Sequence, residues 1–264
     1  MYYMFMDQKQ IIINNQLISY LSKTGTGEKC LLFLHGWGSN KEVWQKIVDS
    51  DQWSEASVYC MDLPGFGNSP LASKKQIKEG WSVCDYAEIV KGFIEKLGLK
   101  NVIIVGHSFG GRVGIKLVSN FPSLLLKLVL VDSAGFIDSS SKKRILVWTS
   151  KIVRPLFKLQ FLHSVRRRIY KKIGTEDYIN MPELKETFVK IVSEDLSENM
   201  ARVVCPTLII WGENDVVTPP AFGERMKFLI PNSELIILSQ AGHYSFLDKP
   251  EEFVKILIDF ITLA

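Results

Sequence analysis

The sequence predicts an α/β fold built on a mostly parallel sheet, and three observations support this prediction. First, short runs that are apolar throughout are typical of parallel strands covered by helices on both faces; they span residues 30–35, 58–61, 102–105, 126–131, 208–211 and 235–238. Second, apolar residues at i, i+3 and i+4 spacing predict helices between these runs, at residues 41–48, 83–97, 110–120, 220–229 and 250–263. Third, alternation around Asn14-Asn15 predicts a hairpin, with strands near residues 11–13 and 17–21, that adds antiparallel strands at one edge.

Residues 136–205 interrupt this alternation of strand and helix. Their pattern is helical without a convincing strand, and the next strand begins after Cys205-Pro206. We therefore expect a core in two parts, 1–135 and 206–264, with a helical insertion at 136–205. With 264 residues, 47% of them hydrophobic, the chain can bury a large core without a disulfide or a structural metal.

The cysteines and the N-terminus bear on where the protein works. Cys30, Cys60, Cys84 and Cys205 lie far apart, without CxxC spacing and in or beside predicted strands and helices. We therefore expect buried free thiols and no zinc site. The first residues lack the basic and apolar regions of a signal peptide, and no apolar run reaches the roughly 18 residues of a membrane span. These features predict a soluble, cytoplasmic protein.

Positive charge is concentrated in one segment, although the net charge is only +4. Residues 142–172 carry lysines and arginines with no acidic residue among them. The pattern favours a solvated helix face; the alternative is an amphipathic helix making weak contact with an anionic membrane surface. No recognition motif accompanies the charge, so we do not expect nucleic-acid binding. The sequence gives no indication of the oligomeric state.

The segment Gly106-His107-Ser108-Phe109-Gly110 lies between a predicted strand and a predicted helix. A Gly-x-Ser-x-Gly in that context is a nucleophile elbow, in which a sharp turn exposes the serine hydroxyl. Glycines at the flanking positions let the helix pack close to the strand. The alternative is a glycine-rich turn with a solvated serine. We interpret Ser108 as a nucleophile.

A serine nucleophile needs a base and a group that orients the base. Of the four histidines, His243 follows the last predicted strand, in a loop at the edge where active sites of open α/β sheets collect. The acid favoured is Asp215, which follows the strand at 208–211 and completes the chain order Ser, Asp, His. Glu213 and Asp132 are rival acids, and Asp215 could instead be an ordinary turn residue.

Acyl transfer also needs donors for the oxyanion. The backbone N–H of Phe109, directly after the serine, is one candidate, and the N–H of Trp37 in the loop His35-Gly36-Trp37-Gly38 is the other. We expect the substrate pocket to be mostly apolar, which favours a small or medium acyl or aromatic substrate. Its lining is expected to include His35, Gly36, Phe136, Trp148 and Tyr244.

The chain resembles the α/β-hydrolase superfamily over nearly all of its length. Five motifs in the family's order carry the resemblance: His35-Gly36-Trp37-Gly38, Asp62-Leu63-Pro64-Gly65-Phe66-Gly67-Asn68-Ser69, Gly106-His107-Ser108-Phe109-Gly110-Gly111, Pro206 to Asp215, and Ala241-Gly242-His243. The resemblance implies a sheet of about eight strands, a lid inserted after the sixth, which matches residues 136–205, and Ser108, Asp215 and His243 as a catalytic triad. The serine in the elbow departs from the haloalkane dehalogenase and epoxide hydrolase branches, whose nucleophile is aspartate.

The lidded single-domain form is most similar to small carboxylesterases and to carbon–carbon bond hydrolases that act on ring-cleavage products. The sequence therefore predicts a serine hydrolase that cleaves carboxylic esters through an acyl-enzyme, with no metal and no organic cofactor. Hydrolysis of a carbon–carbon bond in a vinylogous diketone is the alternative, and lactonase and thioesterase activities are also open. A non-catalytic binding module is a further reading, against which the intact serine, acid and histidine argue.

Overall fold

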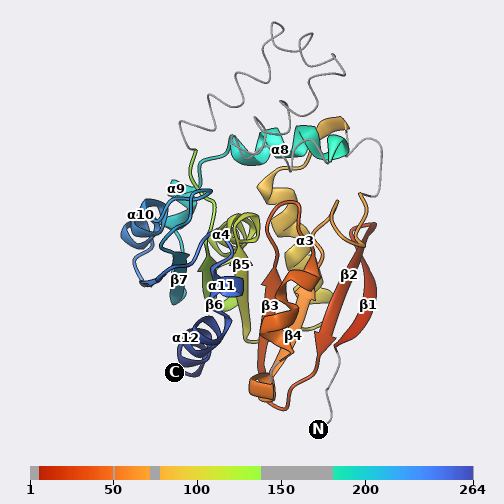
Figure 1. The fold of residues 1–264 in the computed structure, drawn as a ribbon. Coiled ribbons are helices and arrows are strands. Elements are labelled where there is room, and N and C mark those ends of the chain that lie inside the picture. Colours follow the sequence, from red (N-terminus) through yellow and green to blue (C-terminus); the bar gives the residue numbers. More distant parts are fainter. Residues whose placement is uncertain (1–5, 50, 72–77, 138–180, 264) are drawn as a thin grey trace, which may run out of the picture.

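The computed structural model describes residues 6–49, 51–71, 78–137 and 181–263, which form an eight-stranded sheet between two layers of helices (Figure 1). The strands are β1 Asp7–Ile13, β2 Gln16–Lys23, β3 Lys29–Leu34, β4 Ala56–Met61, β5 Val102–His107, β6 Leu125–Val131, β7 Thr207–Gly212 and β8 Ser233–Leu238. Their order in the sheet is β1-β2-β4-β3-β5-β6-β7-β8. Strands β3 to β8 run parallel, and β1 and β2 are antiparallel at one edge. The predicted α/β fold is confirmed.

The hairpin between β1 and β2 turns at Asn14 and Asn15, as predicted. Both residues have positive φ, 48° and 62°. Asparagine tolerates this left-handed region better than most residues, and two such residues make the turn whose twist matches the flanking strands. Ile13 consequently pairs with Gln16, and the register continues to Asp7.

The helices occupy the predicted segments with small changes at their ends. The α-helices are α1 Gln45–Val48, α3 Val83–Lys96, α4 Phe109–Asn120, α8 Lys185–Val192, α9 Ser197–Met200, α10 Ala221–Leu229, α11 Ser245–Asp248 and α12 Pro250–Thr262, and the 3-10 turns are η1 Lys41–Trp44, η2 Asp51–Trp53 and η5 Pro182–Leu184. The helix predicted at 41–48 is therefore a 3-10 turn followed by one α-helical turn.

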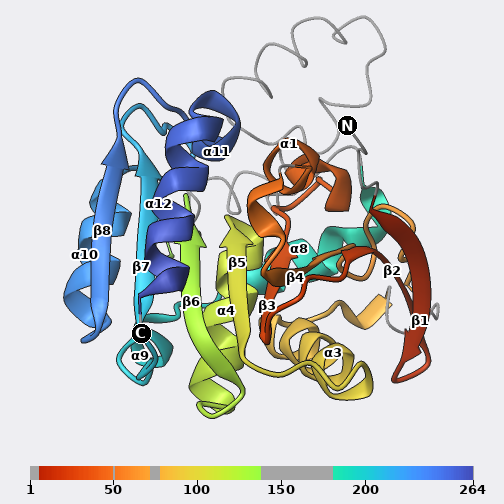
Figure 2. The ribbon, with the colours of Figure 1, turned by 90° about the horizontal axis from the view of Figure 1, so that it is seen from below.

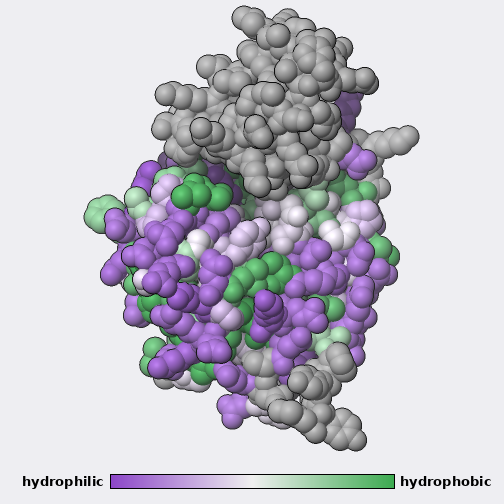
Figure 3. Space-filling model, in the orientation of Figure 1, coloured by the Kyte–Doolittle hydropathy of each residue, from purple (hydrophilic) through white to green (hydrophobic). Residues whose placement is uncertain are grey.

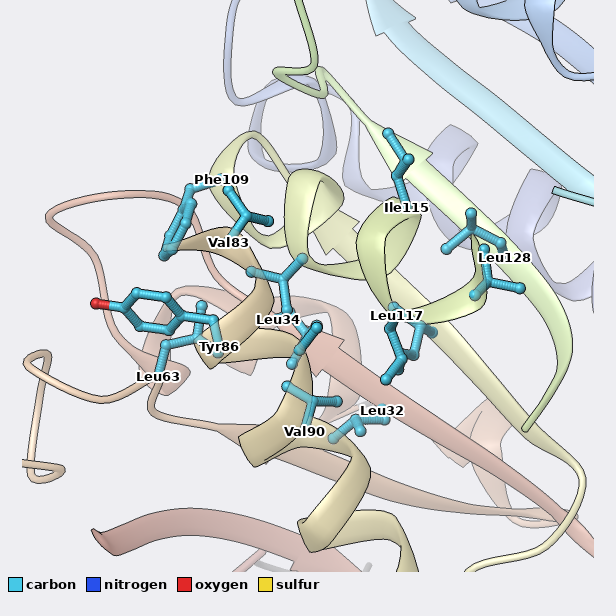
Figure 4. Close-up of a cluster of buried hydrophobic side chains, with 14 of the residues drawn as sticks. Leu32, Leu34, Leu63, Val83, Tyr86, Val90, Phe109, Ile115, Leu117 and Leu128 are labelled. Carbon is cyan, nitrogen blue, oxygen red and sulfur yellow. The ribbon is translucent and has the colours of Figure 1, made fainter. Parts of the chain in front are cut away.

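Helices cover both faces of the sheet (Figure 2), and each face packs against its own apolar core. The α4-side core joins the sheet to α3, α4 and α10 and includes Leu32, Leu34, Val90, Phe109 and Met226. Figure 4 shows part of this core, with Leu32 and Leu34 facing side chains of α3. The α12-side core joins the opposite face to α1, α11 and α12 and includes Leu31, Phe33, Ile47, Phe246 and Phe253. Because successive strand residues point to opposite faces, β3 has to be apolar at every position from Cys30 to Leu34.

The insertion between β6 and β7 contributes η5, α8 and α9 within its described residues. The buried apolar side chains among these described residues belong to the α4-side core; they are Phe136, Leu184, Ile191, Leu196, Met200, Val203 and Cys205. The basic segment 142–172, with Trp148 and His163, lies outside the described residues, so its membrane contact stays a prediction.

The polarity of the surface and the state of the cysteines can be compared with the expectations from the sequence. On the face seen in Figure 3, the described surface is mostly hydrophilic, with apolar residues in scattered groups. All four cysteines are free thiols; Cys30, Cys60 and Cys205 are buried as predicted, and Cys84 is half-buried. Among the residues that the structure describes, no helix is both long enough and apolar enough to cross a membrane.

Candidate active site

Ser108 occupies the sharp turn between β5 and α4. Its backbone has φ 50° and ψ −106°, a conformation that residues with a side chain rarely adopt. The turn is fixed to the end of β6 on both sides: the Ser108 N–H donates to the carbonyl of Val131 (3.0 Å), and its carbonyl accepts from the N–H of Ala134 (3.1 Å). The predicted strand–turn–helix context of this serine is therefore present.

The glycines around the turn allow the backbone to approach itself closely. A Cβ at Gly110 would lie 2.3 Å from the carbonyl oxygen of Leu34, and one at Gly106 would lie 2.6 Å from the backbone of Gly110. Such separations are too short for any side chain. Glycine at these positions therefore lets α4 begin directly against β3 and β5.

Asp215 and His243, predicted as acid and base, are in direct contact. The Nδ1 of His243 lies 2.8 Å from Oδ2 of Asp215, and the aspartate is almost completely buried. The other carboxylate oxygen accepts from the N–H groups of Val217 (2.8 Å) and Thr218 (3.0 Å). This arrangement leaves the Nε2 of His243 as the ring nitrogen that can take up a proton from another group.

Thr218 is a site residue that the sequence interpretation missed. Its hydroxyl lies 2.7 Å from Oδ2 of Asp215 and 3.2 Å from Nδ1 of His243. The sequence signal is the spacing: a hydroxyl residue three positions after an aspartate in a loop can bond back to it.

The two rival acids make other contacts. Glu213 is exposed, and its Oε2 accepts from the hydroxyl of Ser239 and the N–H of Gln240, which lowers its pKa. Asp132 is buried and binds Gly212 and Ser245. Of the three candidate acids, Asp215 is the one in contact with a histidine ring.

His107 lies behind the elbow, against the histidine loop. Its Nε2–H donates to the carbonyl oxygen of His243 (2.7 Å), and its ring also packs against Tyr244 and Phe246. Burial and the neighbouring His243 lower the pKa of His107 well below its usual value, so the ring is neutral at neutral pH. Because His107 directly precedes Ser108, this contact places the serine turn beside the His243 loop.

The loop after β3 lies on the other side of the elbow. His35 donates from Nδ1 to the carbonyl of Gly36 (2.7 Å) and accepts at Nε2 from the N–H of Leu63 (3.0 Å). Its ring is fully buried, so it holds the loop and offers no free nitrogen to a substrate. A Cβ at Gly36 would lie 3.4 Å from the Cβ of Ser108, which places this loop against the serine.

The two expected oxyanion donors lie in segments next to Ser108: Phe109 follows the serine in the chain, and Trp37 follows Gly36, where an added Cβ would lie 3.4 Å from that of Ser108. Phe109 is the first residue of α4, so its N–H has no acceptor within the helix. The N–H of Trp37 makes no backbone hydrogen bond within the described residues. The Trp37 and Phe109 rings meet edge to face at 5.5 Å.

A buried ion pair fixes the end of this loop. The Nζ of Lys41 lies 2.9 Å from Oδ2 of Asp62, and both side chains are fully buried. The same carboxylate also accepts from the N–H groups of Lys41 (2.7 Å) and Asn68 (2.9 Å). Asp62 therefore ties the Trp37 loop to the Asp62–Ser69 segment.

Aromatic rings surround Trp37. Its ring contacts those of Phe66 (5.0 Å), Phe109 (5.5 Å) and, from α8, Phe188 (5.1 Å). Of the other predicted lining residues, Tyr244 is partly exposed beside His243. Phe136 is buried against Phe222 and the Arg225 guanidinium. Trp148 lies outside the described residues.

Arg112, one turn into α4, connects the elbow helix to both ends of the insertion. Its guanidinium donates to the carbonyl of Glu194 (2.7 Å) and to that of Phe136 (3.2 Å). Burial lowers the pKa of Arg112 to about 10, although Glu194 and Asp195 raise it. The spacing of apolar residues in the sequence could not reveal that Arg112 links these segments, because its partners are carbonyl groups far away in the chain.

Comparison with protein families matches residues 31–256 to the alpha/beta hydrolase family. The match covers most of the chain, and the chain therefore belongs to the α/β hydrolase family. This confirms the resemblance drawn from its five motifs.

Relatives with different activities match the chain at similar levels. A 2-hydroxy-6-oxononadienedioate/2-hydroxy-6-oxononatrienedioate hydrolase from Pseudomonas sp is 25% identical over 280 residues, which covers 98% of this chain and 96% of the relative. A monoacylglycerol lipase from Xenopus laevis is 26% identical over 275 residues, covering 94% and 80%. The solved structure of an esterase from Exiguobacterium antarcticum has a TM-score of 0.74 at 21% identity, covering 97% and 100%, and is similar in fold.

Proposed function

We propose that the chain is a serine hydrolase that cleaves carboxylic esters of small to medium, mostly apolar substrates through an acyl-enzyme. The observation that carries the proposal is the 2.8 Å contact between Asp215 and His243, in loops beside the strained turn that holds Ser108. A base that is oriented by a carboxylate and lies in a loop next to a serine turn is the arrangement that acyl transfer requires.

In the proposed reaction, the Oγ of Ser108 attacks the ester carbonyl carbon while His243 Nε2 takes the hydroxyl proton. Asp215 holds Nδ1–H and stabilises the imidazolium that forms. The N–H groups of Trp37 and Phe109 bind the oxyanion. As the carbon–oxygen bond breaks, His243 gives its proton to the leaving alcohol. Water then attacks the acyl carbon while His243 takes its proton; the bond from that carbon to Ser108 Oγ breaks, the acid is released, and His243 returns the proton to Oγ.

The rings around Trp37 support an apolar acyl or aromatic group as the part of the substrate next to the serine. The half-buried rings of Trp37 and Phe188 offer hydrocarbon surface there, and the buried rings of Phe66 and Phe109 pack against Trp37. Such surface binds apolar groups by removing them from water. Residues 136–205 are the proposed lid over this site.

The proposal is tested by the rates of hydrolysis of p-nitrophenyl acetate, butyrate, octanoate and palmitate. We expect an optimum among these acyl chains, and Ser108→Ala should lower kcat by at least about a thousandfold without loss of the fold. An unchanged rate for Ser108→Ala would overturn the proposal.

Hydrolysis of a carbon–carbon bond is the second candidate, because the Pseudomonas relative matches nearly the whole chain. The same serine, acid and histidine would act on a vinylogous diketone. A ring-cleavage dienone included in the rate measurements separates the two: rapid bleaching with slow ester turnover would favour this candidate.

A further inference from the structure

Asp132 is a buried carboxylate for which the proposed reaction has no direct use. It follows the last residue of β6 and is fully buried. Its φ is 45°, a left-handed conformation that aspartate and asparagine adopt more readily than other residues with side chains. Its N–H donates to the carbonyl of Ile210 in β7 (2.9 Å), so the backbone is fixed to the neighbouring strand.

The carboxylate of Asp132 contacts two loops at once. Its Oδ1 accepts from the N–H of Gly212 (2.7 Å), the last residue of β7 and three positions before Asp215. Its Oδ2 accepts from the N–H (3.1 Å) and the hydroxyl (2.6 Å) of Ser245, two positions after His243. One side chain therefore joins the start of the acid loop to the end of the histidine loop.

The backbone of Asp132 adds a third contact to this group. Its carbonyl oxygen lies 3.0 Å from the hydroxyl of Thr218, which in turn contacts Asp215 and His243. Asp132 is thus linked through hydrogen bonds to both members of the acid–base pair while touching neither side chain itself.

We propose that Asp132 is a positioning residue that sets the separation and orientation of Asp215 and His243. This inference rests on the proposed function, in which that pair activates Ser108. Catalysis is sensitive to such positioning because displacements of about 1 Å lower rates by up to about a hundredfold.

The energetics of burial support a role beyond stability. Burial raises the pKa of Asp132 to about 7 against the lowering effect of its hydrogen bonds to Ser245 and Gly212, and the nearby Asp215 adds to the rise. An ionised carboxylate at this position is therefore costly at neutral pH compared with a neutral side chain. The carboxylate can accept hydrogen bonds from two separate loops, one at each oxygen. An amide of the same size has only one oxygen acceptor and cannot do so equally well.

Asp132→Asn is the main test, because asparagine has the same shape and tolerates the positive φ. It keeps one oxygen acceptor and turns a donor toward the other loop. We expect kcat for p-nitrophenyl butyrate to fall at least about tenfold, with KM changed less than about twofold. The low-field proton resonance of His243 Nδ1–H should shift or broaden, even if the variant unfolds at the same temperature as the wild type. A residue that only stabilised the fold would leave this resonance unchanged in such a variant.

Glu213→Gln is the matched control. Glu213 also joins the β7 and β8 loops, through Ser239 and Gln240, but its side chain is exposed. We expect its kcat and its resonance to match those of the wild type. Ser245→Ala removes one of the three hydrogen bonds to the Asp132 carboxylate and should lower kcat less than Asp132→Asn does.

The outcomes separate this inference from the proposed function. Asp132→Asn with wild-type kcat and resonance overturns the inference, as does an effect on KM alone. If Asp132→Asn does not fold, Ser245→Ala with wild-type kcat overturns it instead. If Ser108→Ala loses activity while Asp132→Asn keeps the wild-type kcat and resonance, only the inference fails and the proposed function is retained. An active Ser108→Ala removes the proposed function, and the His243 resonance then still tests the positioning.

Discussion

His107 donates a hydrogen bond from Nε2 to the carbonyl oxygen of His243 across 2.7 Å. The contact fixes the tautomer of His107, with the proton on Nε2 and Nδ1 bare. That Nδ1 is buried and has no hydrogen-bond partner among the described residues. Protonation would place a charge at a buried atom with nothing to stabilise it, which is consistent with the lowered pKa of this ring. The residue before the elbow serine is thus a neutral spacer between the serine turn and the His243 loop.

This neutral ring predicts that His107 makes the fold sensitive to acid. The pKa of His107 is lowered in the folded protein and is about 6.5 when the chain is unfolded, so the unfolded state binds more protons as the pH falls. The contribution of neutral His107 to the free energy of unfolding is therefore fully present above about pH 6.5. Below that pH it falls by up to about 1.4 kcal/mol per pH unit. In urea unfolding at several pH values, His107→Gln should lose less stability than the wild type between about pH 7 and pH 5. If the free energy of unfolding falls with pH equally in both proteins, the prediction is wrong. The buried His35 is present in both, so it cannot account for a difference between them.

Gly36→Ala should lower activity more than stability. The added Cβ would lie 2.8 Å from Nδ1 of His107, which is held on its other side by the His243 carbonyl. We expect the displaced ring to lower kcat/KM at least about tenfold, equivalent to about 1.4 kcal/mol. Gly98→Ala is the control: no atom lies within 4 Å, but its φ of 63° is left-handed, so the variant should lose about 1 kcal/mol of stability at unchanged activity. Equal activity in the two variants would be inconsistent with this account.

Replacement of Arg112 by methionine should loosen both ends of the insertion. The variant keeps an apolar stem but leaves the carbonyl groups of Phe136 and Glu194 without their donors. We expect the free energy of unfolding to fall by about 2–4 kcal/mol, and amide exchange in the described residues flanking the insertion to rise. Lys91→Met, which removes a partly exposed ion pair with Glu95, should cost about 0.5 kcal/mol. The idea fails if Arg112→Met is no more destabilising than that control.

The buried pair of Lys41 and Asp62 should show strong coupling in a double-mutant cycle. Lys41→Met leaves a buried carboxylate without its ammonium, and we expect a loss of about 3 kcal/mol. Asp62→Asn in the same chain removes the uncompensated charge while keeping an oxygen for the Lys41 N–H, so the double variant should recover part of that loss. Additive losses, measured by chemical unfolding, would show that the ion pair contributes little to stability.

The sequence predicted the strands and most helices because their patterns are local. Successive strand residues point to opposite faces, so the apolar run from Cys30 to Leu34 in β3 already implies that both faces are covered. Four-residue helices such as α11 escaped prediction because they are too short to show a period. The 3-10 turn at Lys41 was predicted as α-helix, since a single turn does not distinguish the two spacings.

The contact between Asp215 and His243 agrees with the sequence interpretation. The order of the motifs and the ends of the predicted strands left few candidate residues for the acid and the base. The supporting residues were not predictable in the same way. Arg112, Lys41 and Asp132 are charged residues in segments that periodicity describes as helix surface or loop. Their partners are backbone groups, a carboxylate and a serine hydroxyl that the tertiary fold brings near, and a sequence pattern does not encode that proximity.

The division of the interior into an α4-side core and an α12-side core also determines how this chain would tolerate recombination with a relative. Residues buried from the insertion belong to the α4-side core, among them Leu184, Ile191 and Leu196, whereas the described α12-side core takes no side chain from residues 136–205. A chimaera that exchanges that block alone therefore breaks one core and spares the other. Crossover points chosen to carry α3 and α4 with the block would keep matched packing partners together.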